Sequence, residues 1–271
     1  MSEAIVVLGG ISATADVAEW WPELVGPGRV LDTTRHRVIG FDYETRAEPI
    51  TTADQARALA AHLDSLGIAR VGAIVGSSYG GMVALAFAAA FHARIGRAVV
   101  ISAADVSHPM TTALRSIQRR IVRLGLETST GREALAIARG LAMTTYRTSE
   151  EFEDRFSPIP AGTPPRWDVE EYLESRGAEW TTRTTPERFL ALSLSLDLHT
   201  VDPASIRVPT TLVAVKEDRL VPYDQVRALY RKLPLRAGFH TISSKFGHDA
   251  FLKEPVALGA ILRASFAREA A

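Results

Sequence analysis

The chain has 271 residues, of which 46% are hydrophobic, and its 31 basic and 31 acidic residues balance, so nothing favours nucleic acid or an acidic membrane as a partner. It has no cysteine, which excludes disulfides, thiolate nucleophiles and cysteine-ligated metals. No apolar run approaches the ~20 residues of a membrane helix, and the N-terminus leads into a strand without a signal-like segment, so we expect a cytoplasmic protein that needs no cofactor, metal or membrane.

The first part of the chain alternates apolar runs of strand length with segments of helical periodicity. We predict strands at 4–8, 37–42, 71–75 and 95–101, and helices at 16–25, 51–66 and 82–91. The apolar runs are continuous rather than alternating, which indicates a mostly parallel sheet covered by helices on both faces.

This alternation stops after residue 106. From Pro109 to Leu198 no strand pattern appears and apolar residues recur at helical spacing, which indicates an all-helical lid inserted over the sheet. Strands are predicted again at 210–215 and 239–243, with helices at 185–198, 223–233 and 255–267. The predicted organisation is therefore a core of residues 1–106 and 199–271 and a lid of residues 107–198.

The strand at 71–75 runs into the pattern G-x-S-x-G, with Ser78 at its centre. A nucleophilic serine must stand on a sharp turn between strand and helix, and glycines two residues away let the neighbouring backbone approach closely. The helix N-terminus that follows provides free N–H groups for an oxyanion. The alternative is an ordinary glycine-rich turn between a strand and a helix. The flanking apolar strand and helix favour the nucleophilic serine over this alternative.

Two further post-strand loops provide partners for such a serine. Asp218 follows the strand at 210–215, and His248 follows the strand at 239–243, in the chain order Ser, Asp, His that is typical of this kind of site. His248 would take the Ser78 proton, and Asp218 would hold the imidazole tautomer. Each alone could be a turn or structural residue, as we expect for the remaining histidines: His36, His62, His92, His108, His199 and His240.

Stretches over nearly the whole chain, the lid included, carry a resemblance to a known family: 20–32, 76–82, 138–146, 151–156, 172–177, 196–199 and 247–251. The chain resembles the homoserine O-acyltransferases of methionine biosynthesis, which have an α/β-hydrolase fold, and is most similar to their short, succinyl-transferring branch. The resemblance implies a homodimer formed through the lid.

The resemblance also implies a ping-pong reaction. Ser78 would accept an acyl group from acyl-CoA, the co-substrate, with succinyl favoured over acetyl, and pass it to the hydroxyl of homoserine or a similar amino acid. By matching motif, Arg139 and Tyr146 would hold the substrate carboxylate and Asp249 its ammonium. An amino acid needs one cation and one anion at its charged ends, and arginine offers a planar fork for a carboxylate.

The same resemblance assigns the oxyanion hole to the backbone N–H groups of Tyr79 and Ile11. The sequence departs from the family at Tyr79, where many members have Met, which we expect to affect the acyl pocket. It also lacks a glycine-rich insertion before the helix at 51–66, and family members carry strands before the one at Ala4. We therefore expect one sheet edge to be exposed or covered by a partner chain.

Other functions remain open from the residues alone. An esterase could use the same triad with water as acceptor, although it has no use for the clamp formed by Arg139, Tyr146 and Asp249. A non-catalytic scaffold is disfavoured, because it need not keep all three triad members.

A row of cations occupies one predicted lid helix: Arg115, Arg119, Arg120 and Arg123. We favour a solvated surface, with these cations opposite an apolar stripe from Leu114 to Leu124. The alternative is that part of the row attracts the CoA phosphates or the free carboxylate of a succinyl group.

Overall fold

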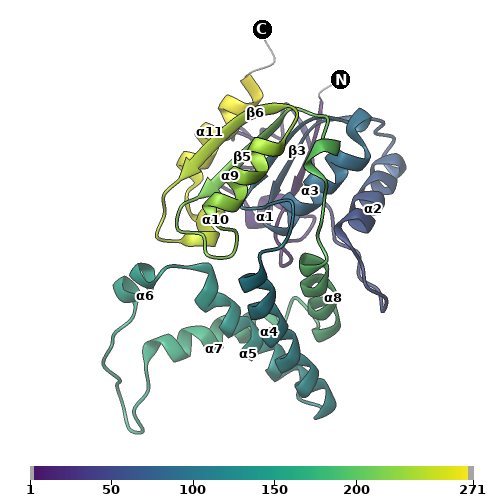
Figure 1. The fold of residues 1–271 in the computed structure, drawn as a ribbon. Coiled ribbons are helices and arrows are strands. Elements are labelled where there is room, and N and C mark those ends of the chain that lie inside the picture. The colour runs from purple at the N-terminus through teal and green to yellow at the C-terminus, as the bar shows by residue number, and fades with distance from the viewer. Residues whose placement is uncertain (1–2, 268–271) are drawn as a thin grey trace.

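A computed structural model describes residues 3–267 as a parallel six-stranded sheet covered by helices, with a helical lid at one end (Figure 1). The strand order is β2-β1-β3-β4-β5-β6, and every neighbouring pair is parallel. The strands are β1 (Ala4–Leu8), β2 (Arg37–Ile39), β3 (Val71–Ser77), β4 (Ile95–Ile101), β5 (Thr210–Val215) and β6 (Arg236–Ile242).

The sheet is buried on both faces because successive side chains of its central strands point into two different apolar clusters. In β1, Val6 and Leu8 pack under helices α2 (Thr52–Ser65), α3 (Tyr79–Ala90) and α9 (Tyr223–Lys232). Ile5 and Val7 pack on the other face, with α1 (Val17–Trp20), α10 (Ala250–Lys253) and α11 (Pro255–Ala267). This two-sided burial confirms the predicted fold class.

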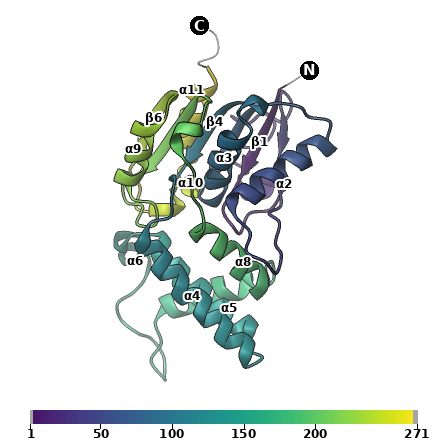
Figure 2. The ribbon, with the colours of Figure 1, turned by 45° about the vertical axis from the view of Figure 1, so that its right-hand side comes forward.

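The lid consists of helices at the carboxyl ends of the strands, where the loops after β3, β5 and β6 also lie (Figure 2). It has a small apolar core of its own, built around Leu135, Trp180 and Phe189. Val106 and Thr200 form an isolated bridge where the chain enters and leaves it. The lid helices are α4 (Pro109–Glu127), α5 (Gly131–Tyr146), α6 (Ser149–Arg155), α7 (Asp168–Trp180) and α8 (Pro186–Asp197).

No strand of the described chain interrupts α4 to α8, as the sequence predicts for an all-helical insertion. Short 3₁₀ turns complete the fold at His92–Arg94, Pro203–Ser205 and Gly247–Asp249. Within residues 3–267, no helix is long and apolar enough to cross a membrane.

Some predicted boundaries are wrong for local reasons. β2 ends at Ile39, and at the next residue, Gly40, the Ala15 backbone lies so close that a Cβ would be 1.9 Å from the Ala15 carbonyl oxygen. β6 begins earlier than predicted, at Arg236, because an edge strand can expose polar residues at its start. Helices α6 and α7 are acid-rich and have no clear apolar period, so their individual positions are not predictable from the pattern.

Candidate active site

Ser78 stands on a strained turn between β3 and α3, with φ 54° and ψ −121°. Both flanking glycines are required sterically. A Cβ at Gly76 would lie 2.3 Å from the Gly80 carbonyl oxygen, and one at Gly80 would lie 2.3 Å from the carbonyl oxygen of Leu8. The chain therefore holds a serine in a left-handed conformation that costs energy, at the edge where parallel strands end.

The three predicted partners form one continuous hydrogen-bonded chain. The Ser78 hydroxyl lies 2.8 Å from His248 Nε2, and His248 Nδ1 lies 2.7 Å from Asp218 Oδ2. The other carboxylate oxygen of Asp218 accepts the backbone N–H groups of Leu220 at 2.9 Å and Val221 at 3.0 Å. Asp218 is therefore fixed from both sides, which orients the imidazole toward the serine.

His248 is buried in the turn after β6, beneath the end of α5. Its burial lowers the pKa, but the charge of Asp218 and the hydrogen bond to it outweigh this effect, so the pKa of His248 is raised above its ordinary value of 6.5. The neutral imidazole, with its proton on Nδ1, is the form that can accept the Ser78 proton at Nε2.

The loop after β1 is fastened to the serine turn. The Gly9 carbonyl oxygen accepts the N–H of Gly80 at 2.9 Å and the Tyr43 hydroxyl at 2.6 Å. Among the described residues nothing accepts a hydrogen bond from the N–H of Ile11, and Tyr79, as the first residue of α3, has no partner within the helix. Both N–H groups thus remain candidates for the predicted oxyanion hole.

The side chain of Tyr79 lies in the core beneath the active site. Its hydroxyl bonds to Ser195 Oγ of α8 at 2.7 Å, and its ring meets the Tyr43 ring edge-on at 4.7 Å between centroids. It does not line the cavity next to Ser78. The Tyr79 side chain thus contacts α8 and Tyr43 rather than the cavity, and the expected influence of this residue on the acyl pocket stays a prediction.

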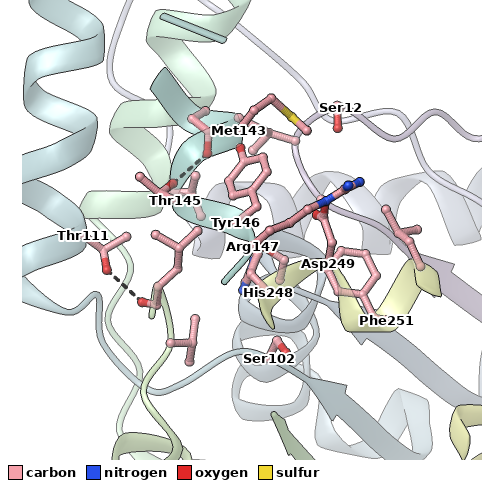
Figure 3. A pocket seen from close by; sticks show the side chains of 18 of the residues that line it. Ser12, Ser102, Thr111, Met143, Thr145, Tyr146, Arg147, His248, Asp249 and Phe251 are labelled. Carbon is pink, nitrogen blue, oxygen red and sulfur yellow. Dashed lines mark hydrogen bonds and ion pairs between the residues drawn. The ribbon is translucent and has the colours of Figure 1, made fainter. Parts of the chain in front are cut away.

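A cavity of about 860 Å³ lies between the sheet and the lid, with Ser78 and His248 among its lining residues (Figure 3 shows His248). Helix α5 contributes Arg139 and Tyr146 to its wall. Arg139 Nη1 donates to the Tyr146 hydroxyl at 3.4 Å, and its guanidinium lies over the rings of Tyr146 and Trp180, at 5.4 and 5.0 Å from their centroids. No acidic side chain of the described chain forms an ion pair with Arg139. The two residues predicted to bind a carboxylate are thus brought together beside the triad.

Asp249 also lines the cavity, but it has a partner that the sequence reasoning missed. Arg147 Nε lies 3.2 Å from Asp249 Oδ2, and Figure 3 shows these two side chains next to each other. Arg147 Nη1 lies 2.6 Å from Glu151 Oε1. Burial lowers the pKa of Arg147, but the electrostatic effect of Asp249, Tyr172 and Glu151 is larger. The pKa of Arg147 is therefore raised above its ordinary value. The i,i+4 spacing of Arg147 and Glu151 is the only local signal for this cluster.

The arginines of α4 divide into two pairs. Arg115 and Arg119 are enclosed against α8, where both contact Asp197, whereas Arg120 and Arg123 are exposed. The expectation of a solvated surface is therefore wrong for the first pair and correct for the second. The buried face of the helix therefore differs from the predicted one, since Ile117 and Leu124 of the predicted apolar stripe are exposed, whereas Arg119 is buried.

His199, one of the histidines expected to be structural, is buried between the core and the lid. Its Nδ1 accepts from the Thr52 hydroxyl at 2.7 Å, and its Nε2 donates to the Ala104 carbonyl at 3.0 Å. Burial lowers its pKa to about 4, so it stays neutral. Over residues 3–267, no three His, Asp or Glu side chains form a group that could hold a metal ion.

The serine turn, the hydrogen-bonded triad and the parallel sheet define an α/β-hydrolase fold. In agreement, the family model described as alpha/beta hydrolase fold matches residues 3–255. Among solved structures, an L374D mutant of esterase E22 superposes with a TM-score of 0.86 at 18% identity, over 97% of this chain and 89% of that one. At this identity the likeness shows the fold alone.

Curated relatives define the family within this fold. A homoserine O-succinyltransferase of Xanthomonas campestris pv. campestris is 44% identical over 95% of this chain and 74% of its own length. A homoserine O-acetyltransferase of Leifsonia xyli subsp. xyli is 31% identical over 92% of this chain and 74% of its own length. The chain therefore belongs to the homoserine O-acyltransferase family.

Proposed function

We propose that this protein is an acyltransferase that moves a succinyl group from succinyl-CoA to the side-chain hydroxyl of homoserine or a similar hydroxy amino acid. The observation that carries the proposal is a complete Ser78–His248–Asp218 chain opening into a cavity where Arg139 has no acidic partner among residues 3–267. The identity to a homoserine O-succinyltransferase supports the choice of acyl group and acceptor.

In the first half-reaction, His248 Nε2 accepts the proton of Ser78 as Oγ attacks the thioester carbonyl. The carbonyl electrons move to oxygen, and the N–H groups of Tyr79 and Ile11 stabilise that oxyanion. Collapse of the intermediate breaks the C–S bond, and His248 returns the proton to the leaving CoA thiolate. The product is an ester between the acyl group and Ser78.

In the second half-reaction the acceptor hydroxyl loses its proton to His248 and attacks the Ser78 ester. The bond between the acyl carbon and Ser78 Oγ then breaks, and His248 returns the proton to Oγ, which frees the serine. Arg139 and Tyr146 hold the carboxylate of the amino acid, while Asp249 holds its ammonium group. Arg147 retains Glu151 as a partner at 2.6 Å, so Asp249 can turn from Arg147 to the ammonium group without leaving the arginine unpaired. Both ends of the acceptor are thereby fixed, which aligns its hydroxyl.

Intact mass spectrometry tests the covalent step. Wild-type protein mixed with succinyl-CoA should gain one succinyl group, and added homoserine should remove it with formation of O-succinylhomoserine. Ser78→Ala should gain none, whereas Ser77→Ala, which changes a buried neighbouring hydroxyl, should still be acylated. An adduct of equal yield on Ser78→Ala would contradict the mechanism, and loss of the adduct to water at the same rate with or without homoserine would favour an esterase.

We also propose that the lid comprises residues 107–198 and that a homodimer forms through it. Helix α4 carries an outward apolar row at i, i+7 and i+14, in which Met110 is 62%, Ile117 47% and Leu124 62% exposed. Such a row needs a partner surface. Sedimentation at micromolar concentration should give a dimer for the wild type and a monomer for Ile117→Glu; a monomeric wild type would contradict the proposal.

The remaining assignments follow from the reaction. The partners are an amino acid and acyl-CoA, with neither nucleic acid nor membrane, and the reaction requires acyl-CoA as co-substrate without a resident cofactor. We place it in the cytoplasm, where CoA thioesters are formed and consumed.

A further inference from the structure

Arg115 is an enclosed cation on α4, with a side chain that is only 12% exposed. Its Nε donates to Asp197 Oδ1 at 2.7 Å, and its Nη2 contacts Ser107 Oγ. No hydrogen bond of the described residues uses Nη1. The guanidinium is therefore held in a fixed orientation by Nε and Nη2, while Nη1 has no hydrogen-bond partner among the described residues.

The charge around Arg115 does not balance. Asp197 also forms an ion pair with Arg119, in which Nη1 of Arg119 lies 2.6 Å from Oδ2 of Asp197 without the alignment of a hydrogen bond. The same Nη1 donates hydrogen bonds to the carbonyl oxygen and the hydroxyl of Ser193. One carboxylate thus serves two enclosed guanidinium groups, and no other acid of the described chain pairs with either. A buried net positive charge is unfavourable unless an anion joins it.

Arg115 faces the same cavity as the triad. Thr111, Arg115 and Gln118 lie on one face of α4, and all three line the cavity together with Ser78 and His248 (Figure 3 shows Thr111). Burial lowers the pKa of Arg115. The charge of Arg115 in turn acts to lower the pKa of His248.

We propose that Arg115 binds the free carboxylate of a dicarboxylic acyl group while the other end of that group is esterified to Ser78. This inference rests on the proposed acyl transfer and names the residue that selects the donor. The reaction brings two carboxylates into the cavity, one on the acceptor and one on the acyl group. Arg139 and the Arg115–Arg119 pair are two positively charged places to receive them.

This assignment predicts discrimination against uncharged acyl groups. Acetyl and butyryl groups bring no anion, so they leave the enclosed charge unmatched, whereas a succinyl carboxylate matches it by charge-assisted hydrogen bonds. A purely structural Arg115, which only ties α4 to α8 through Asp197, would support all acyl groups equally. Binding of the CoA phosphates would also be independent of the acyl group, because every donor carries them.

The test compares succinyl-CoA with butyryl-CoA, which has the same chain length without the carboxylate. We would measure kcat/KM for each donor at saturating homoserine in the wild type, Arg115→Gln and Arg115→Lys, with Arg120→Gln as an exposed control on the same helix. In Arg115→Gln, kcat/KM for succinyl-CoA should fall on the order of 100-fold and that for butyryl-CoA should change by less than about threefold. Arg115→Lys should recover part of the succinyl rate, and the control should match the wild type.

Two results would overturn the assignment. Equal loss with both donors in Arg115→Gln would make Arg115 structural or a phosphate ligand. If Arg115→Gln does not fold, the wild type alone still decides, because similar kcat/KM values for succinyl-CoA and butyryl-CoA would also exclude the proposal. Failure of the proposed function is distinct, since then neither donor would acylate Ser78 at all.

Discussion

The two walls of the cavity handle charge differently. On the sheet side, Asp218 has both oxygens occupied, by His248 and by two backbone N–H groups, so the triad is balanced before substrate arrives. On the lid side, Arg139 has no acidic partner in the described part of the chain, and Arg115 and Arg119 share Asp197. The sheet side therefore holds a catalytic triad whose hydrogen bonds are complete without substrate. The lid side holds arginines whose positive charge a substrate carboxylate would neutralise.

This contrast separates turnover from recognition. If it holds, a change on the sheet side should mainly lower kcat, whereas a change on the lid side should mainly raise the Michaelis constant of one substrate. A residue that joins the two walls without facing the cavity should alter stability and leave both constants nearly unchanged.

The largest expected effect comes from Asp218→Asn. The hydrogen bond that fixes the His248 tautomer would be lost, and kcat should fall roughly 10³- to 10⁴-fold. Steady-state kinetics against the wild type and Asp224→Asn, an exposed control on α9, would measure it. A change in KM with kcat unaltered would contradict the division between the two walls, because it would give Asp218 a role in substrate binding rather than in turnover.

The same variant should change the pH profile. Because Asp218 raises the pKa of His248, wild-type kcat/KM should fall as pH drops through a value above 6.5, where the base becomes protonated. Without the carboxylate this acid limb should move to lower pH, since burial then acts on the imidazole with less opposition. A limb that stays in place would show that another group controls it.

A smaller effect is expected on the lid side from Arg139→Gln. Loss of the charge-assisted contact with the amino-acid carboxylate should raise the homoserine KM by roughly 10- to 100-fold, with little change in the rate of Ser78 acylation by the donor. Two-substrate kinetics and single-turnover acylation would be compared with Arg123→Gln, an exposed lid control. Equal slowing of acylation would contradict a role restricted to the acceptor.

The smallest effect should follow Tyr79→Phe, which removes one hydroxyl from a residue linking core and lid. Loss of the bond to Ser195 should lower the free energy of unfolding by about 1–2 kcal/mol, measured by denaturant titration, with kcat and KM changed less than about twofold. Burial raises the pKa of Tyr79 to about 12, so this loss should not vary with pH near neutrality. A large change in KM would place the side chain in the acyl pocket after all.

The sequence predicts the sheet side well because its signals are local. The glycines beside Ser78 are fixed by backbone clearance. Asp218 follows the fully buried strand β5, and His248 follows the edge strand β6. The lid side is less predictable. Arg147 meets Asp249 across 102 positions, and Arg115 and Arg119 turn inward only because Asp197 of another helix receives them. Periodicity within one helix carries no information about such a partner.

The turn that carries His248 also connects the core to the lid. Gly247 adopts φ 52°, and a Cβ there would lie 2.6 Å from the carbonyl oxygen of Tyr146, the last residue of α5. Just beyond, Thr148 bonds through both its N–H and its hydroxyl to the carbonyl of Lys245. For chimaeras that exchange lids between relatives, the seam that must match is therefore this contact, far from the chain connections at which such proteins would be cut and joined.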